Sequence, residues 1–163
     1  MRILGIDPGL VNTGYGVIDV NDRQQLSCQA AGVIRPTSKE LAVRLLQIHQ
    51  QITAILHEVI PDAMSMEDLF STYSHPRTAI LMGHARGVIY LAASQRAVPV
   101  TNYAPTDVKR AITSHGHAGK EQVQAMVQRL LGLSTTAIPD HVSDALALAI
   151  CHANRERLAL LRR

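Results

Sequence analysis

The segment that best indicates the fold is Met1-Arg2-Ile3-Leu4-Gly5-Ile6-Asp7-Pro8-Gly9. The run from Ile3 to Ile6 is apolar, which indicates a short strand buried on both faces, and Pro8-Gly9 end it in a turn. Asp7 therefore stands at the end of a buried strand, beside a glycine turn. An Asp before Pro-Gly is also common in turns that have no function. Because this Asp follows a fully apolar strand, we favour a functional carboxylate.

Two more strands are expected directly after this segment. Residues 14–20 alternate in polarity, and Asn21-Asp22-Arg23-Gln24 is typical of a turn. A third strand then runs to about Arg35. Three strands joined by short connections predict an antiparallel meander.

Helices are expected to alternate with single strands in the rest of the chain. Ser38 is the predicted N-cap of a helix that runs to about Ile60, because apolar residues recur there at steps of three and four. The elements expected next are a strand over 63–67, a loop to about Pro76, a helix to about Arg96, a strand over 98–103 and two further helices. The order βββ-α-β-α-β-α-α predicts an α/β fold: a mixed five-stranded sheet with helices on both faces.

The composition is that of a globular protein without a membrane span. The 163 residues are 47% hydrophobic and 18% charged, which predicts a single domain over residues 1–163. No apolar run approaches the roughly 20 residues that cross a bilayer. The predicted first strand begins at Met1 with no basic leader, and Cys28 and Cys151 form no disulfide or zinc pattern, so we expect a cytoplasmic protein. A net charge of +3 permits a polyanionic partner without requiring one.

Glu67 is a second candidate for a functional carboxylate. It ends the predicted fourth strand, and strand alternation puts it on one face with Ser65. On its own it is equally explained as a charge that meets solvent at a sheet edge. If the first and fourth strands are neighbours, Asp7 and Glu67 converge at the same end of the sheet.

The last helix begins at Pro139-Asp140-His141-Val142-Ser143-Asp144. His141 and Asp144 are three residues apart and share a helix face, whereas Asp140 is the predicted N-cap. Charged groups at the head of an otherwise apolar helix are costly unless they bind something. Converging carboxylates repel each other, and divalent cations with oxygen ligands such as Mg²⁺ relieve that repulsion. Two such ions about 3.5–4 Å apart can clamp the attacking and leaving oxygens of a phosphodiester.

Seven motifs, taken together and in order, resemble the bacterial Holliday-junction resolvases of the RuvC type. They are Gly5-Ile6-Asp7-Pro8-Gly9, Asn12-Thr13-Gly14-Tyr15-Gly16, Met66-Glu67, His84-Ala85-Arg86-Gly87, Pro105-Thr106-Asp107-Val108-Lys109, Gly116-His117-Ala118-Gly119-Lys120 and Asp144-Ala145-Leu146-Ala147. The resemblance implies a ribonuclease H-like fold, a homodimer and symmetric nicking of four-way junction DNA with Mg²⁺ or Mn²⁺, with two ions expected per active site. It also implies partnership with the RuvA–RuvB branch-migration complex and a preference for a T-rich cleavage sequence.

The resemblance assigns metal-binding and catalytic roles to Asp7, Glu67 and Asp144. Many family members have Asp three residues before the last of these, where this chain has His141, and Asp140 is one residue off that register. Either side chain could complete the second metal site; we expect His141. A neutral imidazole suits Mn²⁺ better than Mg²⁺. His141 could instead position or deprotonate the attacking water.

The loop after Glu67 and two lysines are the expected DNA contacts. Phe70, the one Phe of the chain, either packs under its own loop or stacks on an unpaired base. The resemblance favours stacking for Phe70 and, less firmly, for Tyr73, and we add Arg77 from the same segment. Lys109 and Lys120 match basic positions that the family uses near the scissile phosphate.

Other functions and one assembly question stay open at this point. Gly-x-Asp-x-Gly also occurs in sugar kinases and actin-like ATPases, but these need a second domain that 163 residues cannot supply. A ribonuclease H-like nuclease acting on RNA or on an RNA–DNA hybrid, and a non-catalytic junction-binding module, are the remaining alternatives. Small residues at Ala79, Gly83 and Gly87 let their helix approach either its own sheet or a second subunit.

Overall fold

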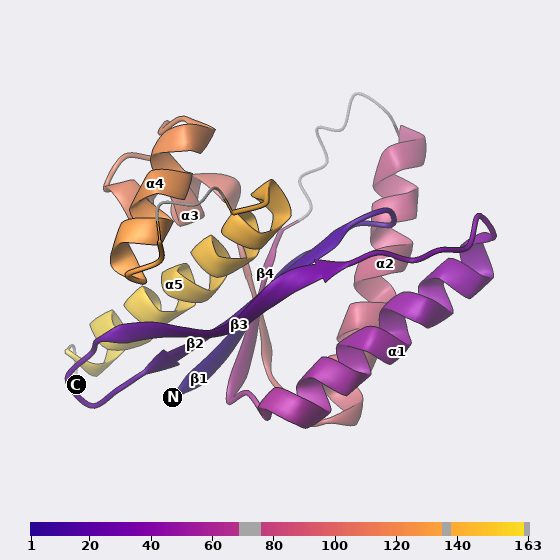
Figure 1. Cartoon of the computed structure of the whole chain (residues 1–163), viewed down its shortest axis with the longest axis horizontal. Coiled ribbons are helices and arrows are strands. Elements are labelled where there is room, and N and C mark those ends of the chain that lie inside the picture. Colours follow the sequence, from indigo (N-terminus) through magenta and orange to yellow (C-terminus); the bar gives the residue numbers. More distant parts are fainter. Residues whose placement is uncertain (69–75, 135–137, 162–163) are drawn as a thin grey trace.

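The computed structural model describes residues 1–68, 76–134 and 138–161, and within them one five-stranded sheet lies between two groups of helices (Figure 1). The elements are β1 (Arg2–Asp7), β2 (Thr13–Val20), β3 (Leu26–Ile34), α1 (Leu41–Val59), β4 (Ala63–Glu67), α2 (Pro76–Gln95), β5 (Val100–Tyr103), α3 (Pro105–Thr113), α4 (Lys120–Leu130) and α5 (Asp140–Leu160). The strand order is β3-β2-β1-β4-β5. β1, β2 and β3 form the predicted antiparallel meander, and β4 and β5 run parallel to β1. The mixed α/β sheet is therefore confirmed.

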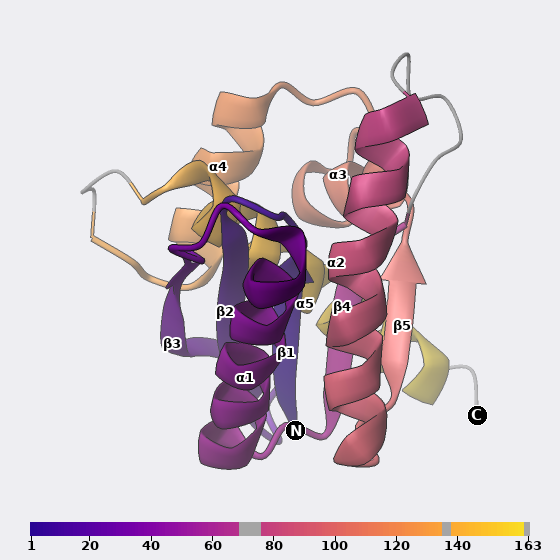
Figure 2. The same cartoon turned by 90° about the vertical axis from the view of Figure 1, so that its right-hand side faces the viewer.

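β1 is the central strand because both of its faces are apolar. Ile3 packs into a core formed with α3, α4 and α5, whereas Leu4 and Ile6 pack into a second core formed with α1 and α2. Figure 2 shows α1 and α2 together on one side of the sheet. The alternation along β1 places Asp7 on the same face as Ile3, which is the face that α5 covers.

The register of β1 against β4 brings the two strand-end carboxylates together. Ile6 is paired with Met66, so Asp7 and Glu67 are the next residues on adjacent parallel strands. Met64 and Met66 lie in the core with α1 and α2, which leaves Ser65 and Glu67 on the α5 face, as the alternation predicted. The predicted convergence of Asp7 and Glu67 at one end of the sheet is confirmed.

Glycines in β1 and β2 allow α5 to lie directly on the strands. A Cβ atom at Gly5 would lie 1.9 Å from the carbonyl oxygen of Ala145, and one at Gly14 would lie 1.9 Å from that of His141. Only glycine fits such an approach of two backbones. Gly14 is also the residue that pairs with Asp7 across the β1–β2 ladder, so the first turn of α5 is held beside Asp7.

Two predicted helix caps and the number of helices were wrong. Ser38 is not the N-cap of α1, because its hydroxyl accepts a hydrogen bond from the Glu40 N–H, two residues on, in a turn that precedes the helix. Asp140 is the first helical residue of α5, after Pro139 at the cap, and its carboxylate pairs instead with Lys120. Among the described residues after β5 there are three helices, one more than expected, because Ser114 in a left-handed conformation separates α3 from α4.

Candidate active site

A carboxylate–imidazole pair links the central strand to the last helix. His141 Nδ1 lies 2.7 Å from Asp7 Oδ2, although the two residues are 134 positions apart. The Asp7 side chain is 16% exposed and that of His141 44%. A deprotonated carboxylate only accepts hydrogen bonds, so Nδ1 is the donor to Asp7. In the neutral tautomer that makes this bond, Nε2 keeps its lone pair.

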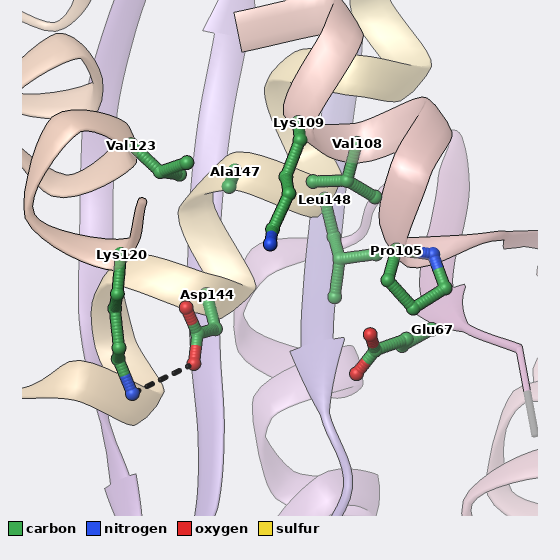
Figure 3. Close-up of a pocket in the computed structure, with 9 residues that line it drawn as sticks. All are labelled: Glu67, Pro105, Val108, Lys109, Lys120, Val123, Asp144, Ala147 and Leu148. Atoms are coloured by element: carbon green, nitrogen blue, oxygen red, sulfur yellow. Dashed lines mark ion pairs between the residues drawn. The ribbon is translucent and has the colours of Figure 1, made fainter. Parts of the chain in front are cut away.

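Asp144 and Glu67 lie on opposite sides of a cavity of about 220 Å³ next to this pair. The lining residues are Glu67, Pro105, Val108, Lys109, Lys120, Val123, Asp144, Ala147 and Leu148. Figure 3 shows Lys109 extending toward the space between the two carboxylates. Lys120 Nζ lies 3.7 Å from Asp144 Oδ2 and 3.0 Å from Asp140 Oδ2. The cavity is thus acidic on two sides, with two lysines directed at it.

The electrostatics of the three acidic side chains show that they are crowded. Burial raises the pKa of Asp7, Glu67 and Asp144, and their mutual repulsion raises the pKa of Asp7 and Glu67 further. The opposing contributions are smaller: the His141 hydrogen bond lowers the pKa of Asp7, and Lys120 lowers that of Asp144. The folded chain therefore holds negative charge that its own side chains do not fully neutralise.

The donor atoms suit a hard divalent cation, although they do not form a closed coordination shell. Carboxylate oxygens are the ligands that Mg²⁺ and Mn²⁺ prefer in proteins, and three carboxylates lie here, at the ends of β1 and β4 and in the first turns of α5, with one imidazole among them. Within the described ranges, no three His, Cys, Asp or Glu side chains are grouped closely enough to hold a metal ion. The contacts above give the reason, because Asp7 Oδ2 faces His141 and Asp144 Oδ2 faces Lys120. A bound cation would replace His141 as the partner of Asp7 Oδ2 and Lys120 as the partner of Asp144 Oδ2.

The structure describes three of the five residues that we expect to contact DNA. Lys109 in α3 and Lys120 at the start of α4 line the cavity. Arg77 is the second residue of α2 and is exposed. Phe70 and Tyr73 lie outside the described residues.

Two features of the site have no counterpart among the expected site residues. The first is the pair of glycines under α5, for which glycine inside a strand pattern is a sequence signal. The second is Arg86, quoted above only as part of a motif. It is 6% exposed, and its guanidinium donates a hydrogen bond to the carbonyl oxygen of Glu67. An arginine between the apolar residues Ala85 and Val88 of a predicted helix was the available signal.

Comparisons with known proteins point to one family of nucleases over nearly the whole chain. Residues 3–152 match the family model described as "Crossover junction endodeoxyribonuclease RuvC". The proteins of that name from Syntrophomonas wolfei and Rhodopirellula baltica are 40% and 47% identical, over 98% and 91% of this chain and 92% and 84% of theirs. The solved structure of T. thermophilus RuvC in complex with Holliday junction substrate is 37% identical, with a TM-score of 0.91, and the match covers 98% of this chain and 96% of that one.

Among the helices of the described residues, none has the length and apolar character that crossing a membrane requires.

Proposed function

The chain belongs to the RuvC family of crossover junction endodeoxyribonucleases, and on that premise we propose that Asp7, Glu67, His141 and Asp144 form its active site. It resolves Holliday junctions in DNA by metal-dependent phosphodiester hydrolysis during recombination and repair. The observation that carries the site assignment is the Asp7–His141 contact, which joins the end of β1 to the head of α5 beside two further carboxylates. Residues 1–163 constitute one ribonuclease H-like nuclease domain in this proposal.

The three carboxylates are the proposed metal ligands. Asp7, Glu67 and Asp144 would hold Mg²⁺ or Mn²⁺, two ions per site, and such a cation supplies Lewis-acid stabilisation of the charge that develops on the phosphodiester. Their raised pKa values favour this role, because a carboxylate that is costly to ionise in the free protein gains most from a cation beside it.

His141 is the side chain that we assign to the fourth position, in preference to Asp140. Asp140 is 62% exposed and pairs with Lys120, whereas His141 contacts Asp7 directly. Because Nδ1 donates to Asp7, the imidazole presents Nε2 to the reacting groups. Nε2 can accept the proton of the attacking water, with the Asp7 carboxylate holding the ring in that orientation.

The lysines are the proposed contacts of the scissile phosphate. In the free protein, Lys120 lies 3.0 Å from Asp140 and 3.7 Å from Asp144, and these two carboxylates, Asp140 first, raise its pKa, so it stays protonated. An ammonium group attracted to Asp144 is also placed to meet a phosphate oxygen once a cation neutralises that carboxylate. Lys109 extends into the same cavity. Phe70, Tyr73 and Arg77 complete the proposed DNA-binding set, with Phe70 stacking on an unpaired base.

Paired symmetric cuts call for two sites related by two-fold symmetry, so we propose a homodimer. α2 offers a suitable surface. Ile80 and Leu91 are 63% and 52% exposed, and a Cβ atom at Gly83 or Gly87 would meet nothing within 4 Å. These four residues follow at steps of three and four, and so lie on one helix face. A cytoplasmic location and partnership with RuvA–RuvB belong to the same proposal.

A cleavage panel tests the function. A synthetic four-way junction, a plain duplex and an RNA–DNA hybrid are each incubated with Mn²⁺ or Mg²⁺. We expect paired nicks in the junction alone, lost in Asp7→Asn and kept in Asp22→Asn, a matched change at an exposed turn residue. Cleavage of the hybrid in preference to the junction would favour a nuclease for RNA-containing substrates, and binding without cleavage would favour a non-catalytic module.

A further inference from the structure

Arg86 is a charged side chain buried on the side of the sheet that faces away from α5. It belongs to α2 and is 6% exposed, next to Ala85, which is fully buried in the core of α1 and α2. A buried guanidinium is costly unless its donors are matched by acceptors. The structure therefore has to supply acceptors at this point.

The acceptors come from the ends of two strands. Arg86 Nη1 donates to the carbonyl oxygen of Glu67, the last residue of β4, and Nη2 lies 3.2 Å from Asn102 Oδ1 in β5. The guanidinium carbon lies 5.7 Å from the ring centre of Tyr90, one helical turn along α2. The Tyr90 hydroxyl is in turn 2.8 Å from Asn102 Oδ1. One side chain thus ties α2 to β4 and to the edge strand β5.

This contact falls on the peptide that carries the Glu67 carboxylate. The β1–β4 ladder pairs residues only up to Met66. On its other side, Glu67 is paired with Tyr103 of β5, and the Asp68 N–H donates to the Tyr103 carbonyl at 2.8 Å. The Glu67 carbonyl lies beyond the last β1–β4 pair and accepts from Arg86. Its side chain lies on the α5 face, where it lines the cavity. The orientation of that carboxylate therefore depends on a peptide held from the other side of the sheet.

We propose that Arg86 is a positioning residue, whose guanidinium holds the Glu67 peptide so that the Glu67 carboxylate is fixed where the divalent cation binds. The proposal rests on the proposed function, since it assumes that Glu67 is a metal ligand. Groups that orient a metal ligand typically change metal affinity or activity by roughly 10–100-fold when they are removed. Arg86 does not line the cavity, so its loss should leave junction binding in the absence of metal nearly unchanged.

The test measures Mn²⁺ affinity without DNA, by calorimetric titration, together with kcat and KM for a four-way junction. Arg86→Met should weaken Mn²⁺ binding and lower kcat by roughly 10–100-fold with KM within threefold of the parent, and raised Mn²⁺ should restore part of the kcat. The Mn²⁺ affinity of Arg86→Lys should fall between those of Arg86→Met and the parent, because a single ammonium nitrogen cannot occupy both of the positions from which Nη1 and Nη2 donate. Arg96→Met, at an exposed arginine just after α2, is the matched control and should match the parent.

Two further variants keep the result interpretable. Asn102 is exposed, so Asn102→Ala tests the same tie with little risk to folding, and should weaken Mn²⁺ binding by a smaller factor. Glu67→Gln should lose Mn²⁺ affinity outright. If Arg86→Lys and Asn102→Ala are folded, as judged by thermal melting, and bind Mn²⁺ like the parent, the positioning role is wrong. A rise in KM with kcat unchanged would also overturn it. Unchanged Mn²⁺ binding in Glu67→Gln would overturn the proposed metal site itself.

Discussion

The two ends of β1 carry similar charged residues but differ in whether those charges are matched. At its start, Arg2 Nε lies 2.7 Å from Asp19 Oδ1, the Arg2 guanidinium also donates to the Val59 carbonyl, and the Arg2 N–H donates to Asp62. The hydrogen bond and charge of Arg2 lower the pKa of Asp19. At its end, burial and neighbouring carboxylates raise the pKa of Asp7.

From this difference we infer that the cluster at the start of β1 is structural and propose that the one at its end is functional. At the start of the strand, each charge has a partner within the chain, so nothing further needs to bind. At the end, four carboxylates, those of Asp7, Glu67, Asp140 and Asp144, share two lysines and one imidazole. A divalent cation would supply the positive charge that this end lacks. Substitutions at the end of the strand should therefore reduce cleavage, whereas a substitution at its start should affect stability alone.

The largest expected effect is the loss of cleavage in Asp7→Asn. The amide keeps the shape of the side chain but removes the charge, and a metal-bound site supplies several kcal/mol of transition-state stabilisation, so the rate should fall by on the order of 10³-fold or more. Asp19→Asn, the same change at the other end of the sheet, should leave the rate within twofold. Single-turnover cleavage of a four-way junction measures both. If the cleavage rate fell by a comparable factor in both variants, the charge of Asp7 would have no particular role in the reaction.

His141 comes next in expected size. His141→Ala removes the group that contacts Asp7, and loss of a general base typically costs about 10²–10⁴-fold. In the parent we expect faster cleavage with Mn²⁺ than with Mg²⁺, and His141→Asp should narrow that gap, because a carboxylate suits Mg²⁺ better than an imidazole does. Rates with both metals, measured in both proteins, check this. Equal rates in the parent would refute the proposed metal preference.

Phe70→Ala should weaken cleavage of junctions while leaving Mn²⁺ affinity intact, because stacking on a base contributes about 1–3 kcal/mol and involves no metal ligand. Turnover and calorimetric titration of the same preparation give the two numbers. Unchanged turnover would mean that Phe70 only packs under its own loop.

The smallest effects concern stability, and their signs differ between the two ends. The raised pKa of Asp7 means that ionising it opposes folding, so this contribution to stability falls as the pH rises from the ordinary carboxyl pKa through the raised one. Asp19 has a lowered pKa, so its contribution is present above the ordinary pKa and is lost as the pH falls through the lowered one. At neutral pH, Asp7→Asn should raise the Tm, and Asp19→Asn should lower it by a smaller amount because solvent screens the Arg2–Asp19 pair. Thermal melting at several pH values without metal tests both signs, and a Tm that falls in both variants contradicts the comparison.

The sequence was sufficient to predict the strand-end carboxylates but not the contacts that support them. Asp7 and Glu67 could be predicted because buried strands end visibly in the apolar pattern, and parallel neighbours bring their ends together. Asp140 was misassigned as a cap because its alternative partner, Lys120, is 20 residues away and becomes a neighbour only in the folded chain. The role of Arg86 could not be predicted because its acceptors are neutral oxygens, which leave no charge pattern in the sequence.

The most direct test of the account is the anomalous diffraction of crystals soaked in Mn²⁺. The account predicts a Mn²⁺ peak bounded by the carboxylates of Asp7, Glu67 and Asp144, with Lys120 withdrawn from Asp144. Soaked crystals in which these carboxylates stay apart, with no peak between them, would contradict it.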